Sequence, residues 1–136
     1  MKLTHVVAAI IIKDNKYFIA KRAKGKHLEH MYEFPGGKLY TNETHEKGLK
    51  REIKEELDIE IDIIDKIGEE NFSDNKINVK IHYYICSHKS GKITLNEHQD
   101  SAWVTKEEFK NYEFAEGDKD YFFVIMINFT NNITQN

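Results

Sequence analysis

The segment at residues 44–57 constrains the fold most, because its apolar residues recur with the spacing of one helix face. These residues are Leu49, Ile53 and Leu57. Thr44 is a suitable N-cap, and Glu46 would lie in the electropositive first turn. We therefore expect a helix over residues 44–57, and its apolar stripe requires another layer of structure to pack against.

Most of the other regular segments have the alternation and β-branched composition of strands. The expected strands are residues 4–12, 17–20, 59–67, 77–88, 92–95 and 103–104, with Ser90 and Gly91 as a hairpin turn between the fourth and fifth. Residues 21–32 read as a long loop, residues 105–108 as a capping box that starts a short helix, and residues 121–129 as an apolar C-terminal helix. Strands interleaved with helices predict an α/β fold, a mixed sheet with helices on its faces.

The chain has the size and the balance of one folded domain. It has 136 residues, of which 40% are hydrophobic and 32% charged. We see no linker or internal repeat, and only the polar tail at residues 130–136 looks dispensable. We expect a single domain over residues 1–136.

Charge and cysteine content exclude several classes of partner. The formal net charge is -3, from 20 basic and 23 acidic residues, so no basic field would gather long nucleic acids. The apolar run at residues 6–12 is too short to span a bilayer, so we expect neither a membrane partner nor a targeting segment. Cys86, the single cysteine, lies in an apolar alternating run and is expected to be a buried structural thiol, which fits a cytoplasmic location.

Three carboxylates border the apolar stripe of the expected helix. At about 100° per residue, Glu52, Glu55 and Glu56 crowd one flank instead of lying opposite the core. Like charges four residues apart destabilise a helix unless a cation compensates them. Such a cluster of hard oxygen ligands suits Mg²⁺ or Mn²⁺. Arg51 can pair with Glu55 or with the more distant Glu43. A merely charged surface helix is the alternative if the pattern stands alone.

The pattern does not stand alone, since it extends over residues 37–59. The spacing G-x5-E-x7-R-E-U-x-E-E-x-G-U is matched by Gly37, Glu43, Arg51, Glu52, Ile53, Glu55, Glu56 and Ile59. This segment resembles a Nudix box, with one departure: Asp58 stands where the family has glycine, and Asp tolerates a left-handed C-cap. Residues 18–23, 32–38, 97–100 and 103–104 are also similar to MutT-like members, so the resemblance covers nearly the whole chain.

The resemblance implies a Nudix fold, an α/β/α sandwich around a mixed sheet, and a hydrolase acting on a nucleoside diphosphate linked to a second group. Divalent metal, Mg²⁺ or Mn²⁺, would neutralise the phosphates and lower the pKa of bound water. The implied ligands are Glu52, Glu55, Glu56, Glu97 and the carbonyl of Gly36, which without a Cβ can turn inward at positive φ. The resemblance implies Glu52 as catalytic base with Arg51 beside it, and Gly37 and Glu43 as structural residues of the box.

The substrate end of the site is implied by the flanking segments. Arg22 and Lys38 offer positive charge to phosphates, and Phe34 either stacks on a base or belongs to the core. Asp118 matches a position that contacts the nucleobase in MutT-like enzymes, although it also precedes the C-terminal helix as a natural N-cap. An ionised Asp only accepts hydrogen bonds, which favours the guanine edge.

We therefore expect the substrate to be a small-molecule nucleotide. The expected enzyme is a nucleoside triphosphate pyrophosphohydrolase that acts on guanine-type or oxidised purine nucleotides such as 8-oxo-dGTP. It would yield a nucleoside monophosphate and pyrophosphate. The alternatives are a CTP or dCTP pyrophosphohydrolase, an ADP-ribose or nucleotide-sugar hydrolase, and a non-enzymatic nucleotide-sensing Nudix domain. The sequence does not specify the oligomeric state.

Overall fold

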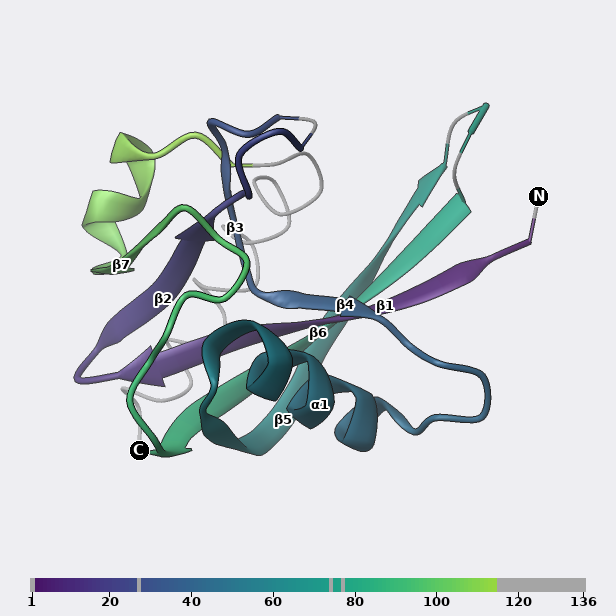
Figure 1. Cartoon of the computed structure of the whole chain (residues 1–136), viewed down its shortest axis with the longest axis horizontal. Coiled ribbons are helices and arrows are strands. Elements are labelled where there is room, and N and C mark those ends of the chain that lie inside the picture. Colours follow the sequence, from purple (N-terminus) through teal and green to yellow (C-terminus); the bar gives the residue numbers. More distant parts are fainter. Residues whose placement is uncertain (1, 27, 74, 77, 115–136) are drawn as a thin grey trace.

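A mixed sheet of seven strands forms the centre of the computed structural model, which describes residues 2–26, 28–73, 75–76 and 78–114 (Figure 1). Its main path runs β3-β2-β1-β6-β5, while β4 pairs with β1 and β7 pairs with β2. The elements are β1 (Thr4–Lys13), β2 (Lys16–Lys21), β3 (Tyr32–Glu33), β4 (Gly36–Lys38), α1 (His45–Leu57), β5 (Glu60–Ser73), β6 (Asn78–Ser90), β7 (Asp100–Val104) and the 3-10 helix η1 (Glu107–Asn111). The expected mixed α/β sheet is confirmed.

Strand β1 organises the sheet because both of its edges are paired. One edge runs parallel to β6, from Thr4 opposite Val79 to Ile12 opposite Ser87. The other edge is divided between two antiparallel partners, β2 near its C-terminal end and β4 near its N-terminal end. The backbone N–H of Ala9 donates to the carbonyl of Pro35 at 2.8 Å. The antiparallel edge of β1 therefore divides beside Pro35 into a fork between β2 and β4.

Helix α1 begins and ends as its sequence predicts. The Thr44 side chain accepts a hydrogen bond from the Lys47 backbone N–H at 3.2 Å. At the other end Asp58 adopts the left-handed conformation, with φ 57° and ψ 35°, and its N–H donates to the Lys54 carbonyl. Asp58 thus fills the position of the box glycine without lengthening or unwinding the helix.

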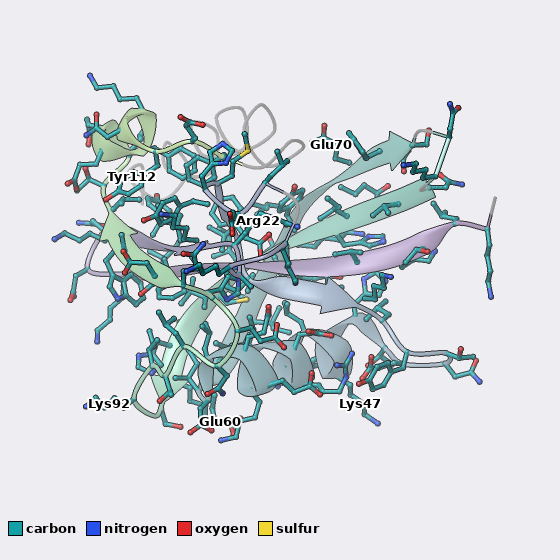
Figure 2. All side chains as sticks on the ribbon, turned by 45° about the horizontal axis from the view of Figure 1, so that its top comes forward. Arg22, Lys47, Glu60, Glu70, Lys92 and Tyr112 are labelled. Carbon is teal, nitrogen blue, oxygen red and sulfur yellow. The ribbon has the colours of Figure 1, made fainter. Side chains whose placement is uncertain are left out.

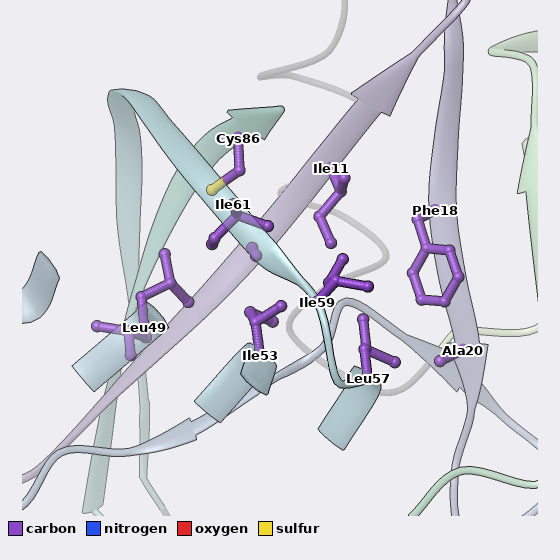
Figure 3. Packing of buried hydrophobic residues seen from close by; sticks show 11 residues of the cluster. Ile11, Phe18, Ala20, Leu49, Ile53, Leu57, Ile59, Ile61 and Cys86 are labelled. Atoms are coloured by element: carbon purple, nitrogen blue, oxygen red, sulfur yellow. The ribbon is translucent and has the colours of Figure 1, made fainter. Parts of the chain in front are cut away.

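Two hydrophobic cores lie on the two faces of the sheet, because alternate residues of β1 point to opposite sides. Val7, Ala9 and Ile11 face α1 and pack with Leu49, Ile53, Leu57 and Ile59 (Figure 3). Cys86 is buried in this core, and burial raises the pKa of its thiol to about 12. The expected structural role of this thiol is confirmed. The second core, on the opposite face, combines aliphatic residues with the aromatic rings of Tyr17, Phe34, Tyr83, Phe109 and Phe114.

Several expected elements differ in the structure. Residues 92–95 do not form a strand; instead the Thr94 N–H donates to the Leu57 carbonyl at 2.9 Å and closes the last turn of α1. The hairpin expected at Ser90 and Gly91 is therefore not formed. Strand β6 pairs antiparallel with β5, which ends at Ser73, six residues beyond the expected end at residue 67. The capping box of Thr105 and Glu108 is confirmed, but the helix it precedes is a short 3-10 helix.

Some expectations fall on residues outside the described part of the chain. These are the helix at residues 121–129, the tail at residues 130–136, Ile77 and Asp118. Among the described residues, no helix is long and apolar enough to cross a membrane.

Candidate active site

A cavity of about 450 Å³ lies at the fork where β1 changes partner from β2 to β4. Strands β1 and β4 form one wall, α1 a second, and the segments after β2 and before β7 close the rim. Eight residues named from the sequence line it: Arg22, Phe34, Gly36, Gly37, Lys38, Glu52, Glu56 and Glu97. The structure therefore brings most of the expected site into one cavity.

The two glycines at the start of β4 allow α1 and β1 to approach the strand closely. Gly36 has φ +157°, and a Cβ there would overlap the backbone carbonyl of Val7. A Cβ at Gly37 would lie 2.5 Å from Oε2 of Glu52. Gly36 thus has the positive φ expected of it, while Gly37 makes room for the catalytic-base candidate.

Arg51 holds the acidic residues of the box in fixed positions. It binds Glu43 through two parallel hydrogen bonds, Nε to Oε2 at 2.7 Å and Nη2 to Oε1 at 2.9 Å. Its Nη1 donates to Glu52 at 2.9 Å and to Glu55 at 3.3 Å, and Nη2 also reaches the Lys38 carbonyl at 3.1 Å. These five hydrogen bonds match the five N–H donors of a guanidinium. The two that Glu43 accepts, together with a hydrogen bond from the Tyr40 backbone N–H, hold the pKa of Glu43 at about 2.

Glu52 combines a fixed position with a shifted pKa. Its side chain lines the cavity and is 15% exposed. Burial raises the pKa of Glu52, the hydrogen bond from Arg51 opposes this shift, and the charges of Glu55 and Glu97 add to it. A carboxylate whose pKa moves toward neutral is better suited to accept a proton from water.

Glu56 is a buried carboxyl group with incomplete hydrogen bonding. Its pKa rises to about 9 because of burial and the nearby charges of Glu52, Glu97 and Glu33, while a backbone hydrogen bond from Gly36 acts in the opposite direction. Its Oε2 atom is buried without a hydrogen-bond partner. Such a group is costly unless a cation or a proton compensates it.

The donor set fits a divalent cation. Glu52, Glu56 and Glu97 line the same cavity as the backbone of Gly36, and oxygen ligands suit Mg²⁺. Glu55 is not among the lining residues; its carboxylate turns to Arg51 and is 48% exposed. In the described part of the chain no three acidic, histidine or cysteine side chains already converge as ion ligands. A bound cation would draw the mutually repelling carboxylates together.

Part of the cavity lining is basic, and we call these side chains the basic rim. They are Arg22, Lys38 and Lys26, and Figure 2 shows Arg22 near the middle of the molecule, whereas Lys47 and Lys92 project at the periphery. Lys26 was not predicted from the sequence, because a lysine in a loop gives no signal of its own. Positive and negative side chains therefore line the same cavity.

Glu33 and His98 connect this rim to the carboxylates, and they were not identified from the sequence as site residues. Arg22 Nη1 donates to Glu33 Oε1 at 2.5 Å, and His98 Nε2 lies 2.9 Å from Glu33 Oε2. The same His98 atom lies 4.0 Å from Glu56 Oε1. Both residues lie within segments that resemble the MutT-like members, but only the fold shows that they meet.

Phe34 belongs mainly to the core. It is 4% exposed and packs against Tyr83, Phe109 and Phe114 in the aromatic cluster, with part of its surface on the cavity. Of its two expected roles, the structure shows the core role. The apolar part of the cavity wall also includes Ile81 from β6.

Comparison with known proteins agrees with this geometry. The family model described as the NUDIX domain matches residues 6–122. The chain belongs to the Nudix hydrolase family. It is 33% identical over 114 residues to an 8-oxo-dGTP diphosphatase of Buchnera aphidicola subsp. Schizaphis graminum, covering 84% of this chain and 86% of the relative.

Two further relatives extend the comparison. The chain is 31% identical over 118 residues to a CTP pyrophosphohydrolase of Escherichia coli K12, covering 87% of each. A solution structure of the DNA mismatch repair protein MutT, of the Nudix hydrolase family, from methicillin-resistant Staphylococcus aureus 252 superposes with a TM-score of 0.76. That structure is 34% identical and covers 93% of this chain and 98% of its own. The expected Nudix fold and the assignment as an enzyme of this family are thus confirmed.

Proposed function

We propose that this Nudix hydrolase is a metal-dependent nucleoside triphosphate pyrophosphohydrolase that yields a nucleoside monophosphate and pyrophosphate. The observation that carries the proposal is that one cavity is lined both by the carboxylates Glu52, Glu56 and Glu97 and by the basic side chains Arg22, Lys26 and Lys38. A cation bound by the carboxylates, together with a polyphosphate bound beside the basic side chains, would satisfy both sets of charges. The volume of the cavity, about 450 Å³, is of the order of the volumes of small-ligand sites.

Glu52, Glu56, Glu97 and the Gly36 carbonyl would hold Mg²⁺ or Mn²⁺, with Glu55 joining them if it leaves Arg51. The bound cation would supply charge neutralisation at the phosphates and acidify water. Glu52 accepts the proton as water attacks phosphorus, because Arg51 fixes its carboxylate and burial raises its pKa. The attack breaks one phosphoric anhydride bond. Arg22, Lys26 and Lys38 stabilise the charge on the departing phosphate oxygens.

For the base we propose a guanine-type or oxidised purine, such as that of 8-oxo-dGTP. Support comes from the relative named 8-oxo-dGTP diphosphatase and from Asp118, whose carboxylate offers two acceptors to the N1–H and 2-amino group of guanine. The relative named CTP pyrophosphohydrolase has nearly the same identity and favours CTP or dCTP as the second candidate.

A panel of nucleotides decides between these substrates. We would assay 8-oxo-dGTP, dGTP, CTP, dCTP and ADP-ribose with Mg²⁺, and score pyrophosphate against orthophosphate. The expected result is pyrophosphate release with the highest kcat/KM on 8-oxo-dGTP. A preference for CTP would overturn the base assignment, and cleavage of ADP-ribose alone would overturn the triphosphate assignment.

A further inference from the structure

Three histidines meet between the N-terminal end of α1 and the sheet, and none of them lines the active-site cavity. His5 lies on β1, His82 lies on β6, and His45 is the first residue of α1. The strand register explains why they meet. Val7, which packs toward α1, pairs with His82, and His5 precedes Val7 by two residues, so both imidazoles lie on the α1 face of the sheet.

Two of these imidazoles already present nitrogen atoms to each other. Nδ1 of His5 lies 2.9 Å from Nε2 of His82, and the two rings are inclined by only 25°. Two imidazole nitrogens on one tetrahedral ion, each bound at about 2.0 to 2.1 Å, would be about 3.3 Å apart. A small opening of the observed pair would therefore give the spacing of a metal-bound pair.

The pair can be reached from solvent. His5 is exposed, and it lines, together with His45, a second cavity of about 490 Å³. The imidazole of His45 is already engaged, because its Nδ1 lies 2.7 Å from the Tyr84 hydroxyl. In the part of the chain that the structure describes, no three acidic, histidine or cysteine side chains converge on one point. Two protein ligands, with water from the cavity in the remaining positions, are therefore what the geometry offers to an ion.

The protonation of His82 suits a metal ligand. Burial and, after it, the charge of Lys66 lower the pKa of His82 to about 4, so the ring is neutral at neutral pH, and the neutral imidazole is the form that binds metal. An ammonium group only donates, so the contact of Lys66 Nζ with His82 Nδ1 at 2.9 Å leaves the single proton of this ring on Nε2. That N–H donates to Nδ1 of His5.

A carboxylate near His82 can stabilise the other tautomer. Oε2 of Glu69 lies 3.4 Å from Nδ1 of His82 and 3.0 Å from Nζ of Lys66. When an ion takes Nε2, the proton of the ring moves to Nδ1, where Glu69 accepts it, and Lys66 keeps its ion pair with Glu69. Histidines that bind metal commonly donate their other N–H to a carboxylate, which fixes the tautomer and makes the ring a better ligand.

We propose that His5 and His82 form a binding site for a divalent transition-metal ion of the Zn²⁺ type, with Glu69 orienting His82. Imidazole ligands suit Zn²⁺, Ni²⁺ and Cu²⁺, whereas Mg²⁺ prefers the oxygen ligands of the active-site cavity. An ion at this place joins the N-terminal end of β1 to β6, and it stabilises the fold because the unfolded chain does not hold the two rings together. The inference goes beyond the proposed hydrolysis and does not depend on it.

The first test is a calorimetric titration of the full chain, without a histidine tag, with Zn²⁺ in the presence of saturating Mg²⁺. We expect a site whose affinity falls at least roughly 10-fold in His5→Gln and in His82→Gln. His88→Gln, at a histidine of β6 that contacts the Gly91 carbonyl, is the matched control and should bind as wild type does. His5 is exposed, so His5→Gln tests the site even if His82→Gln does not fold, and circular dichroism melting reports the folding of each variant. Equal affinity in wild type, His5→Gln and His88→Gln would overturn the proposal.

The decisive test uses two substitutions that should act in opposite directions. Lys66→Met removes a positive charge and the donor to Nδ1 of His82, so Zn²⁺ should bind roughly 3- to 10-fold more tightly. Glu69→Gln removes the charged acceptor for the Nδ1 proton and should weaken binding roughly 10-fold. Weaker binding in both variants, or no change in either, would overturn the coordination by His82.

Two further measurements locate the ion. The melting midpoint should rise with Zn²⁺ in wild type and not in His5→Gln. The electron paramagnetic resonance spectrum of bound Cu²⁺ should show splitting from two nitrogen ligands in wild type and from fewer in His5→Gln. A midpoint that rises equally in both proteins, or a Cu²⁺ spectrum with oxygen ligands only, would assign the ion to the carboxylates and overturn the proposal.

Discussion

Arg51 and Glu52 are neighbours in the chain and also bind each other through their side chains, with Nη1 of the arginine 2.9 Å from Oε1 of the glutamate. The same guanidinium makes a two-point contact with Glu43 and lies 3.6 Å from the centroid of the Tyr40 ring. The base candidate is therefore held by a residue that is itself fixed on several sides. Its carboxylate has little rotameric freedom to lose when substrate binds.

Replacing Glu52 by glutamine should abolish most turnover while the fold remains intact. The amide keeps the shape but cannot accept the proton of attacking water, a loss of about 10² to 10⁴ in rate. Steady-state kcat with Mg²⁺ measures the effect. Glu46→Gln, the same change at an exposed position of α1, is the control and should keep full activity. Near wild-type kcat in Glu52→Gln would move the base role to another carboxylate, with Glu97 next to test.

Replacing Arg51 by lysine should reduce both stability and activity although the charge is retained. Lysine has three donors on one nitrogen, so it cannot make the five hydrogen bonds of the guanidinium. We expect a loss of about 1 to 3 kcal/mol in the free energy of unfolding, measured by urea denaturation, together with a lower kcat.

Glu43 provides the internal check for this effect. Combining Arg51→Lys with Glu43→Gln should cost less than the sum of the two single changes, because both remove the same contact. Strict additivity would show that the pair contributes no coupling.

Mg²⁺ should stabilise the protein more strongly as the pH rises from 6 to 9. The pKa of Glu56 in the folded protein, about 9, lies above its ordinary value, so the stability from its protonated form is complete at low pH and is lost as the pH rises through 9. A cation replaces the proton and relieves the repulsion among the carboxylates. Thermal melting with and without Mg²⁺ across this range measures the difference. Glu56→Gln should flatten the pH dependence; an equal effect of Mg²⁺ at every pH would contradict the role given to Glu56.

A second pH effect should arise at His82, which is not among the residues that line the cavity. Its Nδ1 lies 2.9 Å from Lys66 Nζ and its Nε2 lies 2.9 Å from His5 Nδ1, while the His45 ring centre is 4.3 Å away and Glu69 is 3.4 Å away. The pKa of His82 is lowered to about 4. Burial is the largest cause, and the positive charge of Lys66 is the second.

Because the folded protein resists protonation of His82, this group destabilises the fold as the pH falls from 6.5 toward 4. We expect the free energy of unfolding to fall by about 1 to 2 kcal/mol between pH 7 and pH 5 from this group. Urea titrations of wild type and His82→Gln measure it, with His88→Gln as the matched control. If the wild type and His82→Gln show the same slope with pH, His82 takes up its proton in the folded state.

Local patterns made much of this architecture predictable. Thr44 and Asp58 mark the two ends of α1 correctly, because capping depends on a few neighbouring residues. The box at residues 37–59 is equally local: the glycines, the arginine and the carboxylates meet through one turn and one helix. Spacing within a single helix is a feature that sequence expresses directly.

Contacts between distant segments were not predictable in the same way. His98 and Glu33 are 65 residues apart, and they meet only because β7 and β3 both pair with β2. Residues 92–95 alternate like a strand, yet the last turn of α1 leaves carbonyls that need donors, and this segment supplies them. The hydrogen bonds to α1 therefore determine the conformation of residues 92–95, and their alternating pattern does not.

The base preference depends on Asp118, which lies outside the described residues, and its test is chemical. Asp118→Asn keeps one acceptor and replaces the other by a donor. A guanine-type substrate then loses one of two hydrogen bonds and sets an N–H against an N–H, at a cost of about 1 to 3 kcal/mol. Cytosine gains, because N3 accepts from the new amide while the amide carbonyl takes a 4-amino hydrogen. The kcat/KM ratio of 8-oxo-dGTP to CTP should therefore fall roughly 5- to 150-fold. An unchanged ratio would mean that Asp118 does not contact the base and acts only as a helix cap. The proposed preference for guanine would then have no supporting residue in this chain.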